Sequence, residues 1–145
     1  MKNNFKKYLY ALVLTIFVVI GTTSCSKDTA GPQVELSYKM LSDKTWFLDY
    51  LQTINGTTIK TQTYLGQASY FINFLKDNTT LDSDGIVGTY SVEVVNGKIF
   101  VKINAKTKGG NPVTYDYTVE SIGAKVLIMS FENGGTKNKY YYSTK

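Results

Sequence analysis

The sequence predicts an all-β fold, namely an antiparallel up-and-down barrel of about eight strands preceded by a short N-terminal helix. Three observations predict it. From Trp46 onward, short segments alternate apolar and polar residues; Asn-Gly and Gly-Gly pairs separate several of them; and the chain contains only two Pro residues. An open β-sandwich is the alternative, but closure into a barrel removes the exposed edges of a sheet, so we expect the barrel.

The N-terminus has the two parts of a secretory signal. Lys2, Lys6 and Lys7 give a positive start, and an apolar run over residues 8–20 is broken only by Thr15. A transmembrane helix needs roughly 20 apolar residues, so this run is too short to remain as a span. We therefore predict that residues 1–24 form a signal peptide that is removed.

The only cysteine, Cys25, directly follows this segment. The sequence Gly21-Thr22-Thr23-Ser24-Cys25 resembles the lipobox of bacterial lipoproteins, although these usually carry an aliphatic residue at the position of Thr22. The resemblance implies that Cys25 becomes lipidated and anchors the protein to a membrane, since two or three acyl chains make a durable anchor. An ordinary signal peptide followed by a free thiol is the alternative.

Residues 25–33 are expected to form the lipidated cysteine and a flexible tether, because they include Gly31, Pro32 and small polar residues. Ser26, where an Asp would favour retention at the inner membrane, resembles lipoproteins of the outer membrane. We therefore expect a protein of the cell envelope, lipid-anchored at the outer membrane on its periplasmic face or at the cell surface, with residues 34–145 as one barrel domain.

The composition excludes several functions. Three of the sixteen Lys lie in the predicted signal peptide, so the rest carries thirteen Lys against eleven acidic residues, and no basic run indicates nucleic-acid binding. The chain has no His and no Arg, and so lacks the commonest general base, the commonest metal ligand and the usual phosphate clamp. We expect no catalytic residues, no metal and no cofactor, and hence no enzyme.

The elements follow in order from residue 34. Val34, Tyr38 and Leu41 have helical spacing, which predicts a short helix over residues 34–43. A first strand over 46–54 turns at Asn55-Gly56 into a Thr-rich strand that we place at an edge. Further strands are expected at 69–75, 79–81, 88–95, 98–104, 113–120, 125–131 and 137–143. The strand at 125–131 is apolar on both faces and is expected to be central.

Three segments resemble the lipocalin-like lipoproteins of Gram-negative bacteria: residues 41–48 leading through Trp46, the strand at 70–74 and the strand at 88–92. The resemblance spans residues 36–142 and implies a barrel. True lipocalins have Gly two residues before the Trp, where this chain has Lys44, and an Arg that stacks over the indole. The resemblance therefore implies the barrel rather than a retinol-type or pheromone-type ligand.

Aromatic side chains supply the candidate ligand-binding residues, which are Trp46, Tyr70, Tyr90, Tyr115 and Tyr117. Trp46 either lines a cavity or plugs the end of the barrel against the helix. Tyr115 and Tyr117, with Tyr140 and Tyr142, either line a pocket with their hydroxyls or pack as ordinary strand residues.

Asp82-Ser83-Asp84-Gly85 has the spacing that opens a calcium loop, but the later ligands are missing and a hairpin turn explains the segment better. The sequence thus predicts a non-enzymatic barrel that binds a small apolar or amphipathic molecule at the cell envelope. The alternative is an accessory lipoprotein that docks on an envelope protein partner.

Overall fold

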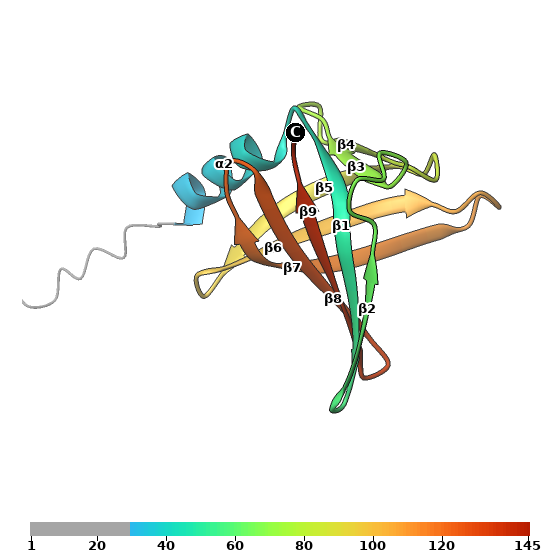
Figure 1. Ribbon diagram of the computed structural model, residues 1–145. Coiled ribbons are helices and arrows are strands. Elements are labelled where there is room, and N and C mark those ends of the chain that lie inside the picture. Colours follow the sequence, from blue (N-terminus) through green and yellow to red (C-terminus); the bar gives the residue numbers. More distant parts are fainter. Residues whose placement is uncertain (1–29) are drawn as a thin grey trace, which may run out of the picture.

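The computed structural model describes residues 30–145, so that the predicted signal peptide and Cys25 lie outside the described residues. One helix and nine strands make up this part of the chain (Figure 1). Their bounds are α2 Ala30–Leu41, β1 Lys44–Asn55, β2 Thr58–Thr63, β3 Phe71–Phe74, β4 Thr79–Asp82, β5 Val87–Val95, β6 Lys98–Lys106, β7 Pro112–Ile122, β8 Val126–Asn133 and β9 Thr136–Ser143.

Eight of the strands close an antiparallel barrel. From β3 to β9 each strand pairs with the next in sequence, and β1 pairs with both β3 and β9, which completes the ring. In Figure 1, β5, β6 and β7 cross behind β1, β8 and β9. The pairing of β1 with β9 confirms the predicted barrel, and an open sandwich is excluded because the sheet has no gap at this junction.

Strand β2 lies outside this ring. On one edge of β1, residues 44–47 pair with β3 and residues 50–55 pair with β2. On the other edge, the pairing with β9 shifts register between Leu48 and Tyr50. All six residues of β2 are exposed, as predicted for a Thr-rich edge strand. The β1–β2 hairpin extends beside the β8–β9 hairpin, away from α2 (Figure 1).

Helix α2 packs against β5 and β7 at one end of the barrel. Because β4 pairs with β5 only over residues 87–89, the N–H of Val92 has no strand partner on that side. The hydroxyl of Tyr38 accepts a hydrogen bond from this N–H at 3.3 Å, and the Tyr38 ring lies 5.3 Å from the ring of Tyr90. The helix therefore covers an edge of the sheet that the short β4 leaves open.

Trp46 plugs this end of the barrel. Its side chain is fully buried, and its Nε1 donates a hydrogen bond to the carbonyl of Leu41 at 2.9 Å. Lys44 Nζ lies 5.2 Å from the centre of the indole ring and donates to the carbonyl of Ala124 at 3.1 Å. Lys44 thus places a cation over the face of the buried indole.

The core fills the barrel between this plug and the middle of the strands. Fully buried side chains on β1, β3, β6 and β8 pack against one another there, because every second residue of a strand faces inward. They include Trp46, Phe74, Val101, Leu127 and Met129.

Two predictions about elements are corrected. The helix begins at Ala30 rather than at residue 34, so that the last four residues of the predicted tether are helical; Pro32 is tolerated because the first turn of a helix needs no N–H from it. Strand β8 is not buried on both faces: Leu127 and Met129 face the core, whereas Val126 is 48% exposed. On the outer face of this strand Val126, at its start, is exposed, whereas Ile128 is half-buried and Ser130 is buried.

Candidate functional site

A pocket of about 270 Å³ opens into the barrel on the side away from α2, and no residue of α2 lines it. This volume lies just below the ~300 Å³ at which small-molecule pockets typically begin, so the pocket suits only a small ligand of one or two rings. Its floor consists of side chains that are almost fully buried, and its rim consists of residues from the loops before β3 and after β4. The lining residues are Leu48, Tyr70, Phe71, Ile72, Thr80, Asp82, Ser83, Asp84, Ile86, Ile103, Ala105, Tyr115, Tyr117, Tyr140 and Tyr142.

Four tyrosines from two neighbouring regions of the barrel form one wall of the pocket. Tyr115 and Tyr117 lie two residues apart on the inner face of β7, and Tyr140 and Tyr142 lie two apart on β9. The rings of Tyr117 and Tyr140 meet edge to face, with their centres 5.8 Å apart. The alternation of the two strands thus places the aromatic faces against one another and turns the hydroxyls toward the pocket.

The hydroxyls of this wall belong to residues that border the pocket. Among residues 30–145 the enclosed side-chain atom without a hydrogen-bond partner is Asn73 Oδ1, so the hydroxyl of Tyr142 is not an enclosed unpaired group, although Tyr142 is only 9% exposed. Burial raises the pKa of the hydroxyls of Tyr117, Tyr140 and Tyr142, and neighbouring tyrosines add to the rise. The tyrosines are therefore neutral near pH 7, and each hydroxyl can donate and accept one hydrogen bond with a ligand.

An acidic turn forms part of the rim. Asp82 Oδ1 accepts hydrogen bonds from the N–H groups of Asp84 and Ile86, both at 2.9 Å, and Gly85 supports the turn with a φ of 75°. The segment is a hairpin turn between β4 and β5, as the sequence predicts, and not a calcium loop. Among residues 30–145 there is no group of three or more acidic or thiol side chains placed to hold a metal ion.

The structure brings together three of the five predicted ligand-binding residues. Tyr70, Tyr115 and Tyr117 line the pocket, whereas Trp46 and Tyr90 do not. Trp46 belongs to the plug. Tyr90 is buried, its hydroxyl donates to the carbonyl of Leu75 at 3.0 Å, and burial raises its pKa to about 12.

The predicted site leaves out several lining residues. Tyr140 and Tyr142 alternate as Tyr115 and Tyr117 do, which offered all four as possible pocket residues, and the pairing of β8 with both β7 and β9 brings them to one wall. Thr80, which is 4% exposed, lies on a four-residue strand whose sequence carries no signal of a pocket.

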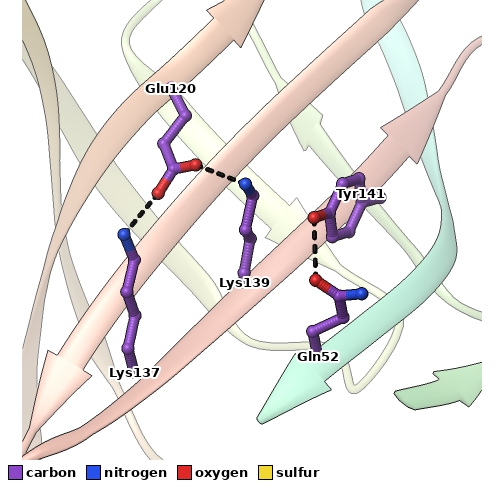
Figure 2. A network of polar contacts seen from close by, with 5 residues as sticks. All are labelled: Gln52, Glu120, Lys137, Lys139 and Tyr141. Carbon is purple, nitrogen blue, oxygen red and sulfur yellow. Dashed lines mark hydrogen bonds and ion pairs between the residues drawn. The ribbon is translucent and has the colours of Figure 1, made fainter. Parts of the chain in front are cut away.

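A second polar cluster lies on the outer face of the barrel, across β7, β9 and β1 (Figure 2). Glu120 is held between Lys137 and Lys139, with N–O distances of 2.6 Å to each, and Tyr141 donates to Gln52 Oε1 at 2.8 Å. Partial burial alone would raise the pKa of Glu120, but the hydrogen bonds from the two lysines and a serine outweigh it and lower the pKa to about 2. This cluster joins strands and has no contact with the pocket.

Comparisons with known proteins add no family to this geometry: no family model, no curated protein and no solved structure matches the chain. No helix among residues 30–145 has the length and apolar character to cross a membrane.

Proposed function

We propose that this protein is a non-enzymatic, lipid-anchored binding protein of the cell envelope, whose barrel holds a small amphipathic molecule. The observation that carries the proposal is the pocket itself, which is lined by four tyrosines and reaches into the barrel as far as the nearly buried Tyr142. Polar groups placed among aromatic side chains in a pocket are the usual means of orienting a small ligand.

Two features favour binding over catalysis. The lining residues combine apolar and aromatic faces with polar atoms in similar measure, which suits an amphipathic ligand. The lining also contains no lysine or cysteine nucleophile. We therefore expect the ligand to be bound and released without chemical change.

Binding can be tested with the full chain in nanodiscs of a neutral lipid. We expect 2-(1-naphthyl)ethanol, a neutral amphipathic probe, to bind in calorimetry, and native mass spectrometry to show a small molecule on protein taken directly from membranes. Ser83→Trp at the rim should block the probe, whereas Thr89→Trp on the exposed outer face of β5 should not. If neither a co-purified molecule nor the probe is found on the unchanged protein, the binding proposal is wrong.

The anchor rests on Cys25 and its position directly after an apolar signal. Mass spectrometry of the N-terminal peptide should find a diacylglycerol on Cys25 of the mature protein. Cys25→Ser should abolish the modification and move the protein out of the membrane fraction. An unmodified Cys25 in membrane-bound protein would refute the anchor and leave the pocket unaffected.

The free edge of β2 favours docking on an envelope protein as the second candidate function. Ile59 is 60% exposed on this strand, and no described strand pairs with its outer edge. Crosslinking in intact cells should then capture a partner that Ile59→Lys releases. Recovery of the protein alone from crosslinked membranes would count against docking.

A further inference from the structure

The pocket combines aromatic faces with acidic groups and has no basic side chain in its lining. Asp82 and Asp84 are the only charged residues that line it, although the described part of the chain contains more lysines than acidic residues. The distribution of charge around the pocket is therefore opposite in sign to that of the whole molecule.

We propose that the ligand of this pocket carries an organic ammonium group, which deepens and rests on the proposed binding function. The structure offers such a group three kinds of contact in one place: carboxylates at the mouth, neutral phenol oxygens deeper in, and aromatic ring faces between them. An ammonium group donates hydrogen bonds and needs acceptors, which the carboxylates and phenols provide.

The turn that contains Asp82 can bind a ligand without losing the hydrogen bonds that hold the turn together. Both hydrogen bonds within the turn are accepted by Oδ1 of Asp82, which leaves Oδ2 to a ligand. Asp82 lines the same pocket of about 270 Å³ as Tyr117 and Tyr142. One ligand of two rings or fewer is therefore able to reach Asp82 and the wall together.

The same groups discriminate against anions. Tyrosine hydroxyls can donate to a carboxylate, and taken alone they would accept a fatty acid or an aryl acid. The two aspartates at the mouth repel such a ligand, and no lysine in the lining offsets them. The charge of the rim, rather than the hydroxyls, decides between the two signs.

Three probes with one naphthalene body test the charge directly: 2-(1-naphthyl)ethylamine, 2-(1-naphthyl)ethanol and 3-(1-naphthyl)propionate. We measure their binding to the full chain in neutral-lipid nanodiscs by calorimetry, with empty nanodiscs as the blank. Because the rim is acidic, the amine is expected to bind about tenfold more tightly than the alcohol, and the acid most weakly. A tenfold difference in affinity corresponds to ~1.4 kcal/mol.

Two substitutions test whether the carboxylate of Asp82 at the rim causes the preference for the amine. Asp82→Asn keeps an oxygen for the turn and should weaken the amine about tenfold while changing the alcohol less than twofold. Asp116→Asn removes the same charge from an exposed position on β7, where Asp116 lies 3.8 Å from Lys102, and should leave all three probes unchanged.

The outcomes separate the two proposals. If the amine binds more tightly than the alcohol and Asp82→Asn abolishes the difference, the ammonium proposal is supported. Equal affinities, or tighter binding of the acid, would overturn it while the binding function stands. If no probe binds and no molecule co-purifies, both proposals fail.

Discussion

Tyr142→Phe provides the sharpest test of how the pocket is built. The substitution removes one oxygen from a residue that is 9% exposed and keeps the ring that packs against Tyr140, with ring centres 6.2 Å apart. The residue borders the pocket, and its hydroxyl is not among the enclosed atoms that lack a hydrogen-bond partner. Its loss therefore relieves little desolvation cost, and we expect the free energy of unfolding to change by less than about 0.5 kcal/mol.

Tyr141→Phe is the matched control, one residue along the same strand. The hydroxyl of Tyr141 points outward and donates to Gln52 Oε1 at 2.8 Å, so the same chemical change breaks a hydrogen bond there. A typical hydrogen bond contributes about 1 kcal/mol, and we expect stability to fall by that amount. Tyr141→Phe should therefore be less stable than Tyr142→Phe by about 1 kcal/mol.

Urea unfolding followed by the fluorescence of Trp46, the only Trp, measures both changes. For a domain of this size, 1 kcal/mol corresponds to a shift in Tm of roughly 4 °C, which calorimetry also resolves. Tyr142→Phe should in addition weaken the naphthyl amine, because one acceptor is lost. A fall in stability of 1 kcal/mol or more for Tyr142→Phe would show that the hydroxyl is satisfied within the protein, and would refute the argument.

Three further predictions concern the frame of the barrel. Glu120 has a pKa of about 2 in the folded protein against an ordinary 4.5, so its ion pairs stabilise the protein above about pH 4.5, and this stability is lost as the pH falls toward 2. Glu120→Gln should lower the unfolding free energy by less than ~1 kcal/mol at pH 7. The unfolding free energy of this variant should also depend less on pH between 4.5 and 2. Trp46→Phe leaves a void and an unpaired carbonyl at Leu41, and should lower the unfolding free energy by about 2–3 kcal/mol in urea; a loss below 1 kcal/mol would contradict the plug. Gly88→Ala would place a Cβ 2.6 Å from a backbone oxygen of β6 and should cost about 1–3 kcal/mol by thermal unfolding, whereas Gly109→Ala, with no neighbour nearer than 3.8 Å, should change stability little.

The sequence by itself determined the order and class of the elements. Alternating residues and turn pairs such as Asn96-Gly97, whose φ angles are both positive, act through local sterics and need no tertiary context. The hairpin at Asp82 was predictable for the same reason, since a carboxylate and a nearby Gly suffice to form it. The predicted export signal and the predicted lipidation of Cys25 likewise rest on the sequence, and both lie outside the described residues.

Only the tertiary structure decided where the pocket lies. The curvature of the closed sheet brings the ring of Tyr140 on β9 against that of Tyr117 on β7 across the intervening β8, and the alternation within each strand does not record this contact. The tertiary structure also decided which inward-facing aromatic residues are packed and which line the pocket. Trp46 and Tyr90 are buried at the end where α2 packs against β5 and β7, whereas Tyr115 and Tyr117 line the pocket at the open end. A strand pattern states which residues face inward, and the packing at each end of the barrel decides whether inward means core or cavity.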